Sequence, residues 1–223
     1  EIYTLSLHDA LPIFDFLSFN GNSGGGGTVG FNLSMNDVDV YIGSATVDAK
    51  DTTEVIAGED NILYSFSAGI GQAKDSSGVG TLSLDIQKND INASIREGAK
   101  INTSDGYDVE NQSVKVKADF DNHLVKGVGA ISIKAGGSGE GSAKGAAIDV
   151  DAAATNVYSY IKGAEVNASK AIDVTAKSNT KLIDITAAGA VSTNGGAYDG
   201  SVGLYVSTGT TEAYIENTQV NKS

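Results

Sequence analysis

The sequence predicts an all-β protein built as a parallel β-helix, or β-solenoid. Three observations carry this prediction. One segment recurs at spacings of 53, 66 and 54 residues, side chains alternate between apolar and polar, and no proline follows Pro12. Recurring units that stack on one another are typical of solenoids, alternation indicates strands, and central strands exclude proline. A β-propeller and a two-sheet sandwich are the alternatives, although propeller blades usually carry aromatic signatures and tryptophan is absent.

The repeat is defined by four segments with a shared pattern. Each contains an isoleucine, a short polar turn, a small residue, any residue, Val or Ile, and then Asp or Asn. The copies are "YIGSATVDAK", "SIREGAKINTS", "YIKGAEVNAS" and "YIENTQVNKS". Their anchors are Ile42, Ile95, Ile161 and Ile215. The same alignment predicts that Val47, Ile101, Val166 and Val220 occupy equivalent inward positions.

The alternation also predicts which side chains face inward. We expect Val38, Val40 and Ile42 inside, and the same for Val157, Ser159 and Ile161. In the stretch before Val157, the apolar Ile148 and Val150 are expected inside and Asp149 and Asp151 outside, because apolar side chains are the ones that a core buries. A repeat of this length is interpreted as about three rungs of a solenoid, since solenoid repeats begin near 20 residues.

The first thirteen residues differ from the rest of the chain. "EIYTLSLHDALPI" resembles, at all thirteen positions, the translation of a common short-read sequencing adapter. We therefore interpret residues 1–13 as an adapter-derived artefact outside the fold. Residues 14–223 form the expected solenoid repeat region, which we interpret as truncated at both ends.

Composition excludes several classes of function. The formal net charge is −13, and Arg96 is the only arginine. This balance argues against nucleic-acid binding, which requires Lys and Arg to neutralise phosphates, and against charge-driven adhesion to anionic lipid. The chain has no cysteine, so it has no disulfide framework or thiolate site. No apolar run approaches the roughly 18 residues that predict a membrane span.

One stretch carries a resemblance to a known family. "GAEVNASKAIDVTAKSNTKLIDITAAGAVS", from Gly163 to Ser192, is similar to the repeats of large bacterial adhesins of type V secretion. These are filamentous-haemagglutinin-like exoproteins, including leukotoxin-family filamentous adhesins. The resemblance covers residues 27–223. It implies a right-handed parallel β-helix in an autotransporter-like passenger, located extracellularly or on the bacterial surface, with roles in cell adhesion and virulence. It also implies an outer-membrane translocation module elsewhere in the protein and no enzymatic activity.

Few residues suggest chemistry. His123 is interpreted as a loop histidine on a solvated turn, and the carboxylate pairs Asp37/Asp39, Asp119/Asp121 and Asp149/Asp151 as a charged outer face, with calcium coordination as the alternative. No catalytic, metal or cofactor site is expected. The alternative function is a β-helical carbohydrate-active enzyme, a polysaccharide lyase or hydrolase, which would need Arg96 among several carboxylates. The expected contacts with a host-cell surface protein or glycan are Tyr41, Tyr158, Tyr160 and Tyr214, because tyrosine combines a large contact area with a polar tip.

The adapter interpretation generates a testable prediction. Deleting residues 1–13 should leave the thermal unfolding midpoint unchanged, because an artefactual segment contributes no native packing. The measurement is a thermal melt of the full chain and of the deletion variant. A loss of several degrees would mean that the segment belongs to the fold.

Overall fold

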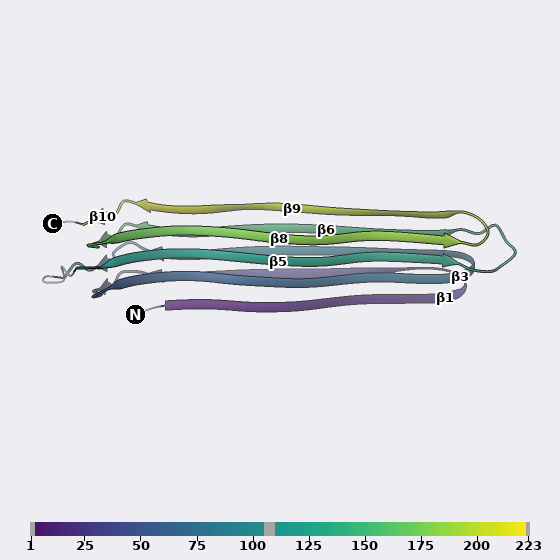
Figure 1. The fold of residues 1–223 in the computed structure, drawn as a ribbon, viewed down its shortest axis with the longest axis horizontal. Coiled ribbons are helices and arrows are strands. Elements are labelled where there is room, and N and C mark those ends of the chain that lie inside the picture. Colours follow the sequence, from purple (N-terminus) through teal and green to yellow (C-terminus); the bar gives the residue numbers. More distant parts are fainter. Residues whose placement is uncertain (1–2, 105–109, 222–223) are drawn as a thin grey trace.

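The chain folds into a two-layered parallel β-solenoid, in which long strands from successive repeats lie side by side (Figure 1). The computed structural model describes residues 3–104 and 110–221, with side chains from Ser23 onward. The strands are β1 (Tyr3–Ile42), β2 (Thr46–Val47), β3 (Thr52–Ile95), β4 (Lys100–Ile101), β5 (Ser113–Lys134), β6 (Ala143–Lys162), β7 (Glu165–Val166), β8 (Ala171–Ser192), β9 (Ala197–Glu216) and β10 (Gln219–Val220). The described residues form no helix, and therefore no helix that is long and apolar enough to cross a membrane.

Each repeat makes one rung of the solenoid. In β3 the chain runs out along one layer, turns a glycine-rich corner, and returns along the other layer (Figure 1). The third and fourth repeats do the same with β5 and β6, and with β8 and β9. The anchors Ile42, Ile95, Ile161 and Ile215 are successive partners in the ladder.

The expectation of about three rungs per repeat is therefore wrong. It assumed strands of ordinary length, about 5–6 residues, whereas β5, β6, β8 and β9 have 20–22 residues each. Polar residues within the repeat do not end these strands, because in a parallel ladder the backbone pairs with the neighbouring rungs whatever the side chain. Only the corners and turns interrupt them.

Two ladders hold the rungs together. The long strands form one sheet in the order β8-β5-β3-β6-β9, with β1 added on β3, and the two-residue strands form a second sheet in the order β10-β7-β4-β2. Every strand pair is parallel. The second sheet aligns Val47, Ile101, Val166 and Val220, as the repeat alignment predicts.

The first thirteen residues were expected outside the fold, but the structure continues β1 back to Tyr3. Residues 3–13 pair in parallel with residues 55–65 of β3. An edge strand can be formed by any extended segment, because the ladder uses backbone groups, and Pro12 is tolerated at an edge. The adapter origin of this stretch stays a prediction, and the deletion experiment measures what its pairing contributes.

A conventional apolar core fills one end of each rung, where the turns with the two-residue strands β2, β4, β7 and β10 lie. It contains Ile91, Ile95, Val157 and Ile161, all fully buried, with Val116 and Phe120 of β5 facing them from the opposite layer. The alternation predicted this core correctly. Outward positions on the same strands carry charged pairs such as Lys115–Glu54 at 3.0 Å.

The half of the solenoid near the glycine-rich corners has many polar side chains inside, beside a small apolar cluster of Val79, Val128, Ala130 and Ala147. On β3 the inward side chains are Thr81, Ser83, Asp85, Gln87 and Asn89, each no more than 4% exposed, whereas the outward Leu82 is 39% exposed. The polar interior is hydrogen-bonded: Asn122 donates to Gln87 at 2.9 Å, and Asn61 donates to Asn122 at 3.1 Å. These bonds satisfy polar groups whose burial would otherwise be costly.

The expected inward and outward faces of β6 are exchanged in the structure, so that prediction is wrong. Asp149 and Asp151 are buried at 0% and 4% exposure, while Ile148 is 44% exposed. β6 continues without interruption from Ala143 to Lys162, so its side chains keep strict alternation from Ile161 back to Asp149. That geometry places both aspartates inside despite their charge.

The asparagines at the end of the repeat pattern have a structural role in the turns. Asn102 and Asn221 follow β4 and β10 with positive φ angles of 55° and 49°, a conformation that asparagine tolerates better than most residues. Their side chains accept hydrogen bonds from the backbone N–H groups of Ala49 and Ala168, both at 2.8 Å. Each asparagine thus connects the turn of one rung to the turn of the rung before it.

The equivalence of Val166 and Val220 allows a matched test of packing. Val166 is fully buried, but Val220, in the last rung, is 43% exposed. Val166→Ala should lower the free energy of unfolding by about 1–3 kcal/mol through lost burial and a residual cavity, and Val220→Ala should cost clearly less. Urea unfolding of both variants measures the difference. Equal losses would contradict the observed rung order.

Candidate functional site

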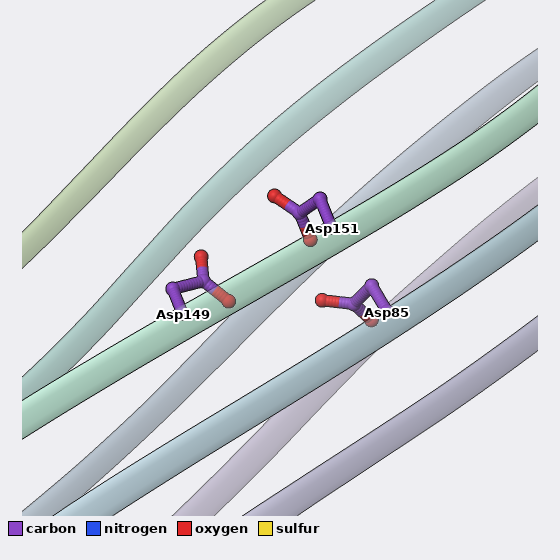
Figure 2. A group of neighbouring side chains, drawn as sticks. All are labelled: Asp85, Asp149 and Asp151. Atoms are coloured by element: carbon purple, nitrogen blue, oxygen red, sulfur yellow. The ribbon is translucent and has the colours of Figure 1, made fainter. Parts of the chain in front are cut away.

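The most unusual chemical feature is a buried ionic cluster in the polar half of the interior. Asp149 and Asp151 project from β6, and Asp85 projects from the neighbouring strand β3, so that the three carboxylates converge (Figure 2). Their ligand oxygens all lie within 4.8 Å of one another. Lys126 reaches the cluster from β5 in the opposite layer and is 1% exposed.

Lys126 is the centre of this cluster. Its ammonium forms ion pairs with Asp85, Asp149 and Asp151, and the Nζ to Asp149 Oδ1 distance is 2.8 Å. A lysine ammonium has three hydrogen-bond donors, which matches three carboxylate partners. The cluster therefore joins the two layers of the solenoid through charge-assisted hydrogen bonds.

The cluster carries more negative than positive charge, and its pKa values reflect this. Burial raises the pKa of Asp151 to about 6, although the hydrogen bond and the charge of Lys126 oppose the shift. Burial likewise raises the pKa of Asp149, and the nearby carboxyl of Asp184 adds to the effect. For Lys126, burial favours the neutral amine, but the hydrogen bonds with the three aspartates outweigh it and raise the pKa.

This arrangement resembles a cation site, but a side chain already supplies the cation. Calcium sites use clusters of carboxylate oxygens, and these three carboxylates are close enough for such a site. The Lys126 ammonium, however, lies among them at hydrogen-bond distance. The chemistry that the cluster supports is internal charge neutralisation and proton uptake by Asp151, rather than metal binding.

Sequence reasoning missed this cluster. Apolar Ile148 and Val150 were assigned to the interior because they are hydrophobic, although continuous alternation from the anchor Ile161 places Asp149 and Asp151 on the anchor's side. The same alternation along β5 puts Lys126 on the side of Phe120. Strand continuity was the signal that could have identified the cluster.

The tyrosines expected at the surface lie at the turn end of the rungs, away from the ionic cluster. Tyr41, Tyr160 and Tyr214 occupy one column of the ladder, with Ser94 in the rung between the first two. Tyr160 and Tyr214 stack with ring centroids 5.1 Å apart and an interplanar angle of 6°. Tyr158 lies in the adjacent column, where its ladder partners are Asn92 and Glu212.

Arg96 fills the gap that Ser94 leaves in the tyrosine column. Its guanidinium carbon lies 4.0 Å from the centroid of the Tyr41 ring, its Nε donates to Ser94 Oγ at 2.9 Å, and it forms an ion pair with Asp39. Burial favours the neutral guanidine, but the hydrogen bond to Asp39 outweighs it and raises the pKa of Arg96. Tyrosine, arginine and tyrosine thus form a continuous outward column.

An open depression lies beside this column. Its volume is about 440 Å³, and it is lined by Arg96, Glu97, Tyr160, Lys162, Gly163 and Asn217. Lys162 pairs with Glu216 at 2.9 Å. The depression offers hydrogen-bond donors, acceptors and part of an aromatic ring to a polar ligand.

The other candidate residues are dispersed. His123 lies in β5 rather than in a loop, and its ladder partners are Ile62 and Lys181. The expectation of a solvated turn was wrong because β5 does not break at "DFDNHLVKG". Asp37 and Asp39 face outward, as does Asp119, which pairs with Lys117. Among the described residues, only the buried aspartates form a group that could hold a metal ion.

The raised pKa of Asp151 predicts a pH dependence of stability. Between the unfolded value of about 3.8 and the folded value of about 6, the folded state binds more protons, so stability should fall as the pH rises through this interval. Urea unfolding should give a free energy of unfolding about 1.4 kcal/mol larger at pH 5 than at pH 7.5. Asp151→Asn should reduce that difference, whereas Asp37→Asn, at an exposed position, should preserve it. An unchanged difference in the Asp151 variant would contradict the assignment.

Comparisons with known proteins leave the family of this chain to be tested. No protein-family model, curated protein or solved structure matches it. The likeness to adhesin repeats therefore stays a prediction from sequence, and the function is argued from the geometry of the solenoid and its outward columns.

Proposed function

We propose that this chain is a non-enzymatic section of a secreted or surface-exposed bacterial adhesin, where it acts as a structural shaft and as a host-binding surface. One observation carries the proposal: each repeat is one rung, paired in register with its neighbours over strands of 20 residues or more. Such a unit can be added many times without changing the fold. A repetitive, extended scaffold is what an adhesin passenger requires.

The scaffold is stabilised in a way that suits exposure outside the cell. The rungs are joined by continuous backbone ladders, by the asparagine bonds between turns, and by the buried Lys126 cluster between layers. None of these contacts depends on a disulfide, since the chain has no cysteine. Repetition, an acidic surface and exposed polar columns are all consistent with a secreted passenger.

The binding surface in this proposal is the column of Tyr41, Arg96, Tyr160 and Tyr214, with Tyr158 beside it. Aromatic rings with polar tips, together with Arg, are enriched where proteins bind other molecules. The depression next to Tyr160 adds hydrogen-bonding groups at one edge. A host glycan or a polar protein surface fits this chemistry better than an apolar ligand.

A β-helical carbohydrate-active enzyme is the alternative function. It would need Arg96 beside accessible carboxylates, as a base or charge-stabilising group. In the structure Arg96 pairs with the exposed Asp39 and lines a depression with Glu97, while the three-carboxylate cluster is buried and begins at Asp85, eleven residues earlier in the chain. At about 3.3 Å per residue, the two features are about 35 Å apart.

Host-cell binding tests the proposed surface. The full chain should bind cultured host cells in a saturable manner, and replacing Tyr41, Tyr158, Tyr160 and Tyr214 with Ser should weaken binding at least about tenfold, since each ring supplies contact area. The control replaces Tyr64 and Tyr198, exposed tyrosines outside the column, and should bind like the wild type. Circular dichroism checks that both variants fold.

Two outcomes would count against parts of this proposal. Turnover of an acidic polysaccharide by the full chain would favour the enzyme and overturn the non-enzymatic role. Equal binding by the column variant and the control variant would remove the tyrosines from the binding surface. A glycan array then separates the two classes of host ligand, because a glycan receptor gives signal without any host protein.

A further inference from the structure

The inverted half of the solenoid leaves an apolar surface on the outer face of the layer formed by β1, β3, β6 and β9. Three successive outward positions on each of these strands are apolar. On β1 they are Val29, Phe31 and Leu33, at 72%, 60% and 49% exposure, and on β9 they are Val202, Leu204 and Val206, at 60%, 51% and 47%. Their partners on β3 and β6 are Leu, Leu and Ile, and Ile, Val and Ala. We call these twelve positions the apolar grid.

The grid has the size of the apolar patches that are often functional on protein surfaces. With strands about 4.8 Å apart and alternate residues about 6.6 Å apart, twelve positions cover on the order of 400 Å². Contiguous apolar patches beyond a few hundred Å² are uncommon on monomers and mark interaction sites. The outer face of the other layer also carries exposed apolar side chains, among them Phe66, Ile131, Ile183, Ile185 and Val191, with glycines such as Gly127 and Gly129 between them.

We propose that the apolar grid is the contact between two copies of this chain packed face to face. The first argument is geometric. The grid repeats at the spacing of the rungs in one direction and of alternate residues in the other, and a second copy presents the same spacings. Rows of one grid can therefore lie opposite rows of the other across the whole contact, with the two sheets about 10 Å apart.

The second argument is electrostatic and sets the orientation. Beyond the grid toward the turns, the first outward row holds Met35 and Lys88, and the second is an acidic row with Asp37 and Asp90, of which Asp90 pairs with Lys88 at 2.6 Å. Beyond it toward the corners, the corresponding row holds Lys144 and Tyr198. A two-fold axis along the solenoid, through the row of Phe31 and Leu204, overlays the grids and brings the acidic row of one copy beside Lys144 of the other.

The small footprint predicts a weak, concentration-dependent dimer, because stable interfaces bury about 800 Å² on each partner. Sedimentation equilibrium of the full chain should show the dimer fraction rising between about 1 and 200 µM. Leu204→Lys, which puts a charge on an already exposed position at the two-fold axis, should remove the dimer. The matched control Ile185→Lys, 64% exposed on the other layer, should leave it intact. Thermal melts confirm that both variants fold.

Cross-linking tests the orientation. The chain has no cysteine, so Leu204→Cys introduces a single thiol that lies opposite its own copy across the axis. A bis-maleimide of about 10 Å, the distance between packed sheets, should link this variant into dimers much faster than Ile185→Cys. Lys144→Glu should lower the dimer fraction by placing acidic groups against each other.

Three results would overturn the proposal. The first is a full chain that stays monomeric at every concentration. The second is association that Leu204→Lys leaves unchanged, as expected if copies join end to end through the exposed strands of their terminal rungs. The third is a monomeric chain that co-sediments with phosphatidylcholine vesicles through the grid, because lipid would then be the occupant.

Discussion

Every long strand hydrogen-bonds in parallel to the strand one repeat before or after it, and this in-register pairing determines the rest of the structure. It aligns the anchors from Ile42 to Ile215, and it brings like positions into columns on both faces. Because the ladder uses only backbone groups, it leaves the side chains free to differ between the two halves of a strand. The apolar core, the ionic cluster and the outward columns are all consequences of that freedom.

The two halves of each rung use different physical chemistry. Near the turns, hydrophobic burial of residues such as Ile95 and Phe120 holds the layers together. Near the corners, the layers are joined by Lys126, by amide and hydroxyl hydrogen bonds, and by a small apolar cluster that includes Val79 and Val128. They approach closely there: a Cβ on Gly71 would lie 2.3 Å from Val79. Buried ion pairs contribute less net stability than hydrophobic packing of the same volume. The corner half therefore contributes specificity of layer registration more than stability.

The sequence predicted the turn half of each long strand better than the corner half. Around Ile161, the alternation of Val157, Ser159 and Ile161 with outward tyrosines gave the strand, its inward face and its place in the repeat. Around Asp149 the same alternation is present, but hydrophobicity alone suggests the wrong face. Alternation shows that a strand has two different faces, and it does not show which of them is buried. Strand length was not predictable either, since no local signal distinguishes a polar residue within a strand from one in a turn. Lys126 became identifiable only when the opposite layer was in place.

One rung per repeat has a consequence for reach. Each rung adds about 4.8 Å along the solenoid, although it uses more than 50 residues, so a thousand residues of this architecture would extend only about 90 Å. The strands, at about 3.3 Å per residue, make each rung about 65 Å wide. The width stays the same however many repeats are added, so a protein built this way is broad for its length. It behaves as a ribbon that presents two wide walls, and each added repeat extends both walls by one strand spacing.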